Sequence, residues 1–109
     1  MSVVQELEAM AGKMNEQPGA LDGLHASYHF HIKDTGKHLQ VYFNDGTVRV
    51  VEDASGDADC TLTMSESHLR KLLRNDLNTT MAYMTGSLRI DGRLGLALKL
   101  QEILKQYQV

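Results

Sequence analysis

The N-terminal stretch has apolar residues at the period of an amphipathic helix. These residues recur at spacings of four, three and four positions: Val3, Leu7, Met10 and Met14. Ser2 and Gln5 form a capping-box pattern at the start. The segment "NEQPGA" (15–20), which holds the only proline of the chain, ends the pattern. The sequence therefore predicts a first helix that begins after Ser2 and packs one face on the core.

From Leu24 onward the apolar period changes to two, which is typical of strands with one buried face. The inward-facing positions of the first two strands are Leu24, Ala26, Tyr28, Phe30 and Ile32, followed by Leu39, Val41 and Phe43. Because "DTGK" and "NDGT" separate these runs, we expect a three-stranded antiparallel meander over residues 24–52.

The two turns predict a register for this meander. With Thr35-Gly36 as a two-residue loop, Ile32 lies opposite Leu39. With Asp45-Gly46 as the second loop, Phe43 lies opposite Val48. Both pairings join apolar residues, so they give one continuous apolar face.

The remaining elements alternate between helix and strand. In order, the pattern predicts a polar loop "EDASGDAD" (52–59), a strand over 58–64, a helix capped by Ser65, a short helix capped by Asp76 and ended by Gly86, a strand over 87–91, and a last helix opened by Asp91 or Gly92. This order predicts an α+β fold with helices on one side of the sheet.

The last helix has more apolar positions than one buried stripe requires. The stripe consists of Leu96, Leu100, Ile103, Leu104 and Tyr107, whereas Leu94, Ala97 and Leu98 fall largely outside it. Five methionines, at positions 10, 14, 64, 81 and 84, are expected to face inward. These flexible side chains either line a cavity for a lipid chain or fill a core that has no Trp and only two Phe.

Composition narrows the class of protein. A chain of 109 residues is expected to form one domain, residues 1–109. The net charge of −3 and the lack of a Lys/Arg cluster argue against a nucleic-acid partner. Glu6 and Glu8 interrupt what would be the apolar core of a signal peptide. A single cysteine, Cys60, excludes an internal disulfide and fits a reducing compartment, so we expect a cytoplasmic protein.

Few residues suggest catalysis or metal binding. His29, His31 and His38 share one face of the predicted sheet, which suits either a zinc site or an ordinary solvated polar row. Cys60 is expected to be a small buried hydrophobe. The segment "GRLG" (92–95) predicts a tight strand-to-helix turn with close backbone packing. No catalytic residue, metal or cofactor is predicted, and we do not expect an enzyme.

The segment "TGSLRIDGRLGLALKLQ" (85–101) resembles the sterol carrier protein type 2 domain family of non-specific lipid-transfer proteins. It reproduces the family's pattern of a glycine (Gly86), a Leu-basic-Ile strand (88–90), a second glycine (Gly92) and a helix reading Gly-Leu-Ala-x-Lys-Leu (95–100). "DADCTLTMS" and "MAYMTG" extend the similarity upstream. The resemblance implies a five-stranded, mainly antiparallel sheet with helices packed on one face, enclosing an apolar tunnel.

The resemblance also implies a function. Family members bind fatty acids, fatty acyl-CoA, phospholipids or sterols, so intracellular lipid binding or transport with transient membrane-surface contact is expected, as a monomer or homodimer. By position, the tunnel-lining residues are Leu62, Met64, Leu77, Met81, Met84, Leu88, Ile90, Leu96, Leu98 and Leu100. The alternative is a protein-interaction or dimerisation module that uses the apolar C-terminal helix and has no lipid ligand.

Overall fold

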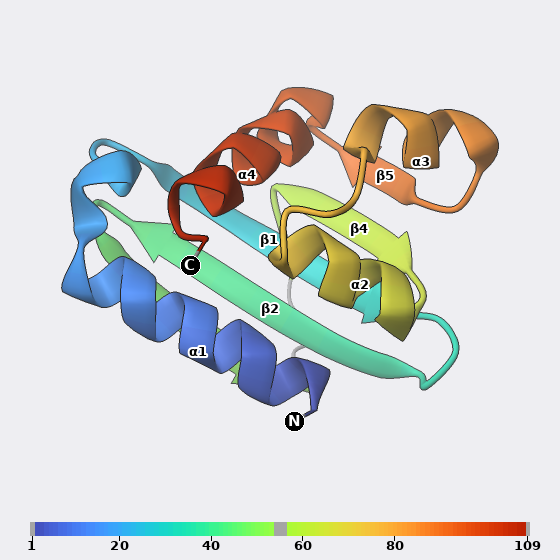
Figure 1. The fold of residues 1–109 in the computed structure, drawn as a ribbon, viewed down its shortest axis with the longest axis horizontal. Helices are drawn as coiled ribbons and strands as arrows, with labels where there is room; N and C mark the ends of the chain where they lie inside the picture. Colours follow the sequence, from blue (N-terminus) through green and yellow to red (C-terminus); the bar gives the residue numbers. More distant parts are fainter. Residues whose placement is uncertain (1, 54–56, 109) are drawn as a thin grey trace.

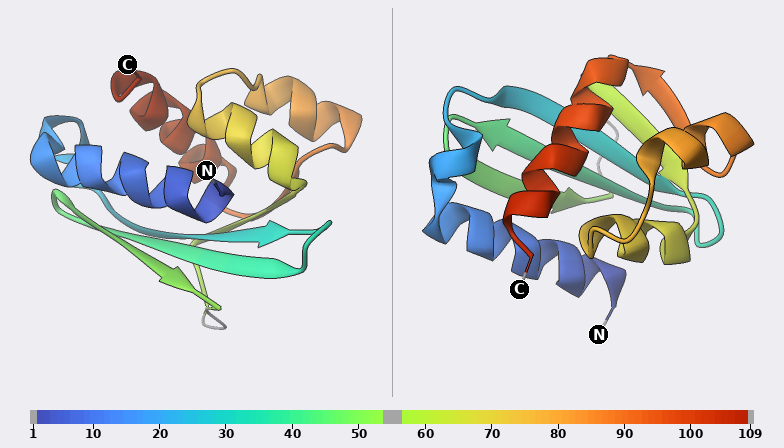
Figure 2. Two further views of the ribbon diagram at one scale, coloured as in Figure 1. Left: turned by 60° about the horizontal axis from the view of Figure 1, so that its bottom comes forward. Right: turned by 45° about the horizontal axis from the view of Figure 1, so that its top comes forward.

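The computed structural model describes residues 2–53 and 57–108, and its centre is a five-stranded mixed sheet with the helices on one face (Figures 1 and 2). The strands lie in the order β3-β2-β1-β4-β5. β1 and β4 are parallel, and every other neighbouring pair is antiparallel. The predicted α+β architecture, mainly antiparallel and covered by helices on one face, is therefore confirmed.

The elements have the following bounds: α1 Val3–Glu16, a 3₁₀ turn η1 Pro18–Leu21, β1 His25–Ile32, β2 Lys37–Asn44, β3 Thr47–Glu52, β4 Cys60–Met64, α2 Glu66–Leu73, α3 Thr79–Thr85, β5 Arg89–Gly92 and α4 Leu94–Gln106. None of the helices in the described part of the chain is long and apolar enough to cross a membrane. Residues 54–56 of the predicted polar loop lie outside the described residues.

The first two helices begin at the N-cap residues that the sequence predicts, Ser2 and Ser65. Ser2 and Gln5 form both hydrogen bonds of a capping box at α1. The Ser65 hydroxyl accepts the backbone N–H of His68 at α2. The Glu6 carboxylate of α1 pairs with Arg70 of α2 at 3.1 Å and with Arg74, which follows the end of α2, at 2.8 Å, so these ion pairs link the two helices.

The meander is confirmed, but the register of its first hairpin is corrected. The structure pairs Ile32 with Lys37 and Phe30 with Leu39, so the loop spans residues 33–36. Only Gly36 takes a left-handed conformation there, with φ of +73°, because a β-branched residue such as Thr35 disfavours positive φ. The shift is by two residues, so every side chain keeps its predicted face.

The second hairpin and the later elements show smaller differences. Phe43 pairs with Val48, as predicted from the Asp45-Gly46 turn. The cap of α3 is Asn78 rather than Asp76, whose N–H instead donates to the Lys71 carbonyl and completes the end of α2. The fourth strand begins two residues later than predicted, at Cys60, and the last helix begins after Arg93.

The core lies between the sheet and the helical layer. Its largest fully buried side chains come from every layer and include Tyr28, Phe30, Ile32, Leu39, Leu62, Met64, Leu69 and Leu104. α1, α2 and α4 lie over the sheet, whereas α3 lies beside the edge strand β5 (Figure 1). This peripheral place leaves much of α3 without a partner surface.

Candidate functional site

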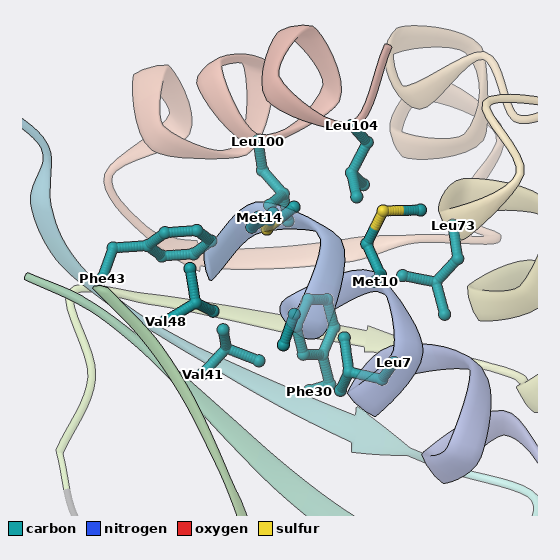
Figure 3. A pocket seen from close by; sticks show the side chains of 11 residues that line it. Leu7, Met10, Met14, Phe30, Val41, Phe43, Val48, Leu73, Leu100 and Leu104 are labelled. Atoms are coloured by element: carbon teal, nitrogen blue, oxygen red, sulfur yellow. The ribbon is translucent and has the colours of Figure 1, made fainter. Parts of the chain in front are cut away.

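Two apolar spaces lie among the described residues, and the first is an interior cavity between sheet and helices (Figure 3). It is lined by Leu7, Met10, Ala11, Met14, Phe30, Val41, Phe43, Val48, Leu73, Leu100 and Leu104. Its volume is about 10 Å³, close to the minimum needed for one water molecule. The side chains fill the interior, so the predicted tunnel stays a prediction.

The second space opens on the surface, between α3, β5 and the first turns of α4. This α3/α4 groove has a volume of about 120 Å³ and is lined by Thr79, Thr80, Tyr83, Ile90, Leu94 and Leu98. Most of these residues are apolar, and none carries a charge. The groove is therefore suited to a hydrocarbon segment rather than to an ionic group.

The residues expected to line a tunnel separate into three groups. Leu62, Met64, Leu88 and Leu100 are buried; Leu77, Ile90 and Leu96 are half-buried; Met81, Met84 and Leu98 are exposed. Ile90 and Leu98 line the α3/α4 groove, and Leu100 lines the interior cavity. The other seven residues of the set line neither of these two spaces.

The expected inward orientation of two methionines is wrong. Met81 is 54% exposed and Met84 is 74% exposed, although both keep the spacing of an apolar helix face. α3 has only seven residues and buries only Thr79 and Ala82, because it lies beside the sheet rather than on it. Sequence reasoning also missed Thr79, Thr80 and Tyr83 as groove residues, since periodicity alone does not place a peripheral helix.

Tyr28 fixes the first turn of α4 to the centre of the sheet. Its hydroxyl donates to the Leu96 carbonyl at 2.7 Å, and its ring packs edge-on against Phe43 at 5.5 Å between centroids. Burial raises the pKa of the Tyr28 phenol well above its usual value, with a smaller contribution from Cys60. The neutral phenol therefore holds α4 over the core at all physiological pH values.

Thr79 has a buried hydroxyl beside the groove. The residue is 2% exposed, and its Oγ1 is without a hydrogen-bond partner among the described residues. Its backbone N–H donates to the Gln101 Oε1 of α4 at 3.3 Å. A buried hydroxyl that makes no hydrogen bond lowers stability.

We expect Thr79→Val to raise the free energy of unfolding by about 1 kcal/mol, because an apolar group of similar shape removes this desolvation cost. Chemical denaturation measures the change. Thr80→Val, at the exposed neighbouring position, is the matched control. A lower stability of Thr79→Val than of the control would show that the hydroxyl has a partner.

The three histidines lie on the outer face of the sheet, away from both apolar spaces. His29 Nε2 lies 2.9 Å from His38 Nδ1, and the rings of His31 and His38 stack at 4.4 Å. His31 pairs directly with His38, not with Gln40 as the predicted register had it. Within residues 2–53 and 57–108, no group of three or more His, Cys, Asp or Glu side chains has the arrangement of a metal site.

The His29 environment predicts a pH dependence of stability. Burial, followed by the neighbouring His38 and His31, lowers the pKa of His29 below its ordinary value of 6.5. At His29 the folded state then binds fewer protons than the unfolded state does, so the contribution of this residue to stability is most favourable above pH 6.5 and falls on acidification. On acidification, we expect the thermal midpoint of His29→Gln to fall less steeply than that of His25→Gln. The second variant changes an exposed histidine of the same strand. Equal slopes would contradict this.

Comparison with known proteins adds the family. The model of the SCP-2 sterol transfer family matches residues 5–105, nearly the whole chain. The chain belongs to this family. Sterol carrier protein 2 of Rattus norvegicus is 38% identical over 78 residues, which cover 68% of this chain and 14% of the rat protein. The chain therefore spans a small part of the length of that relative.

Two further relatives cover more of their own length. A fatty acid-binding protein of Yarrowia lipolytica is 36% identical over 84 residues, covering 72% of this chain and 65% of that protein. The solution structure of palmitated SCP2L2 from Aedes aegypti superposes with a TM-score of 0.75 at 19% identity, covering 100% of this chain and 99% of that chain. This second likeness shows that the fold is shared from end to end.

Proposed function

We propose that residues 1–109 form a single non-enzymatic domain that binds fatty acids or related lipids. The observation that carries the proposal is the α3/α4 groove, which is uncharged, largely apolar and open to solvent. Each methylene transferred from water into such a site contributes about 0.8 kcal/mol. The names of the relatives from Yarrowia and Aedes support an acyl chain as the ligand.

Binding of a whole acyl chain requires the groove and the interior to join. Sites for small ligands usually occupy roughly 300–1,000 Å³, more than the groove's 120 Å³. Ile90 and Leu98 line the groove, and half-buried Ile90 and Leu96 pack against the core, so we place the wall between the two spaces at these three residues. In the proposed mechanism α3 and the start of α4 move outward, and the chain replaces side-chain contacts of this wall.

Flexible side chains make this opening physically reasonable. Met10 and Met14 line the interior cavity, and methionine adapts to different neighbours at small cost because it is unbranched. The only buried residues of α3 are Thr79 and Ala82, so little apolar surface holds that helix in place. Segments with few buried contacts open at lower free energy than the core does.

The ligand class extends in this proposal to acyl-CoA and phospholipid, whose acyl chains have the same chemistry. The proposed location is the cytoplasm, since Cys60 is buried and unpaired and suits a reducing compartment. We propose that the domain carries lipid as a monomer, because one chain supplies all the residues that line the groove. The competing role, a dimerisation module without lipid, predicts a dimer that dissociates in Leu98→Asp while fatty-acid binding stays unchanged.

The experiment is lipid recovery together with a thermal shift. Protein purified without detergent is extracted with organic solvent, and the delipidated protein is then titrated with palmitate. The proposal predicts a recovered lipid and a thermal midpoint that rises with palmitate concentration, because the ligand binds the folded state alone. No recovered lipid together with an unchanged midpoint would overturn it.

A further inference from the structure

One buried hydroxyl in the wall of the α3/α4 groove has no hydrogen-bond partner. Thr79 lines the groove at the start of α3 and is 2% exposed. Its Oγ1 makes no hydrogen bond to any described residue. The other two hydroxyl-bearing residues of the groove, Thr80 and Tyr83, are exposed, so water can hydrate them. Of these three residues, only Thr79 loses the hydration of its hydroxyl on folding without gaining a hydrogen bond.

The backbone around Thr79 is held in place while its side chain makes no bond. The Thr79 N–H donates to Oε1 of Gln101 at 3.3 Å, which ties the residue to α4 on the other side of the groove. The side chain of Asn78, the cap of α3, accepts the N–H of Met81 at 3.0 Å. Because an unpaired buried hydroxyl lowers stability, its presence calls for an explanation, and a ligand oxygen that accepts its hydrogen supplies one.

The lining of the groove determines the charge of the ligand group that suits this hydroxyl. No lining residue has a positive side chain. A carboxylate inside the groove would lose its water without gaining an ion-pair partner there, which is strongly unfavourable. An uncharged oxygen, such as the carbonyl of an ester or the hydroxyl of an alcohol, loses far less on leaving water and accepts the threonine hydrogen.

We propose that Thr79 is a specificity-determining residue of the groove, whose hydroxyl donates a hydrogen bond to an uncharged oxygen on an alkyl chain. The ligand class that follows consists of lipids in which the acyl chain is esterified or is replaced by a long-chain alcohol. A free fatty acid also binds, but its carboxylate stays in solvent and only its chain enters the groove. The inference rests on the proposed function, because it assigns the polar contact of the same lipid site.

The test compares the dissociation constants of dodecanoate, 1-dodecanol and methyl dodecanoate, which have similar chain lengths. Each ligand displaces a fluorescent fatty acid from delipidated protein, in the unmodified chain and in Thr79→Val. We expect the affinities for the alcohol and the ester, each divided by that for dodecanoate, to fall about tenfold in Thr79→Val, because one buried hydrogen bond is lost. A change in the shape of the groove affects all these ligands, so it cancels in the ratios.

Two further variants complete the test. Thr79→Ser keeps the hydroxyl and should keep both ratios. Thr85→Val changes an exposed threonine of the same helix that does not line the groove, and it should leave the ratios unchanged.

The possible outcomes separate this inference from the proposed function. A fall of the ratio for the ester alone, or for the alcohol alone, supports the inference and identifies the oxygen. Ratios that Thr79→Val leaves unchanged, or that Thr79→Ser lowers equally, would overturn it while dodecanoate binding still supports the lipid site. If the unmodified protein binds none of the ligands, the proposed function fails and this inference fails with it.

Discussion

Leu98→Asp is expected to weaken fatty-acid binding at least about tenfold, because a carboxylate in an apolar groove must lose water when an acyl chain covers it. Leu98 lines the α3/α4 groove and is 43% exposed, so the empty protein can hold the new charge in solvent. The free energy of unfolding should therefore change by less than about 1 kcal/mol. Titration with a fluorescent fatty acid measures the first effect and denaturation the second.

The matched control at this position is Leu98→Met, which keeps an apolar side chain of similar volume. It should bind fatty acid close to the unmodified protein. Light scattering of both variants tests the competing role of the C-terminal helix. A dimer that dissociates in Leu98→Asp, with fatty-acid binding unchanged, would favour the dimerisation module and contradict the lipid site.

Gly92→Ala is expected to have the largest effect on stability, a loss of more than about 2 kcal/mol. Gly92 pairs with Cys60 at the end of β5 and has φ of +102°, a conformation that side chains with a Cβ rarely adopt. A Cβ added there would lie 2.5 Å from the Asp59 carbonyl oxygen, so backbone must move. Because α4 begins two residues later, the groove should deform as well.

An alanine at Gly92 lowers stability in two ways, through the positive φ and through the contact of its Cβ with Asp59. Gly86→Ala measures the first effect alone. Gly86 ends α3 with φ of +85°, but a Cβ added there meets no atom within 4 Å. The free energy of unfolding of Gly86→Ala should fall by about 1 kcal/mol, because only the backbone conformation is disfavoured there. Urea denaturation of both variants gives the comparison. Equal losses would mean that the close approach of Gly92 to Asp59 adds nothing.

The sequence predicts the faces of this fold better than its registers. Alternation placed Tyr28, Phe30 and Ile32 in the core correctly, since a strand's period of two survives a register shift of two residues. The predicted register of the first hairpin was wrong, because the length of a turn depends on which of its residues takes a positive φ. In the turn between β1 and β2 only Gly36 does so. The close backbone packing expected at "GRLG" is confirmed at Gly92.

The candidate site was predictable in part. The apolar surplus of α4 pointed to Leu94 and Leu98, and both line the groove. Met81 and Met84 followed a regular apolar spacing, yet they face solvent because their helix lies beside the sheet edge. Spacing within one helix carries no information about where that helix sits on the fold. The buried Thr79 hydroxyl had no signal in the sequence for the same reason.

The central claim, that the wall between groove and core opens around an acyl chain, is tested most directly by isotope-filtered NMR with ¹³C-labelled palmitate. Intermolecular NOEs report which protein methyl groups lie next to the chain. We predict contacts from the palmitate chain to Leu98 and Ile90 in the groove and also to Leu62 and Leu100, which are buried. Contacts confined to exposed side chains of α3 and α4, with none to Leu62 or Leu100, would contradict it.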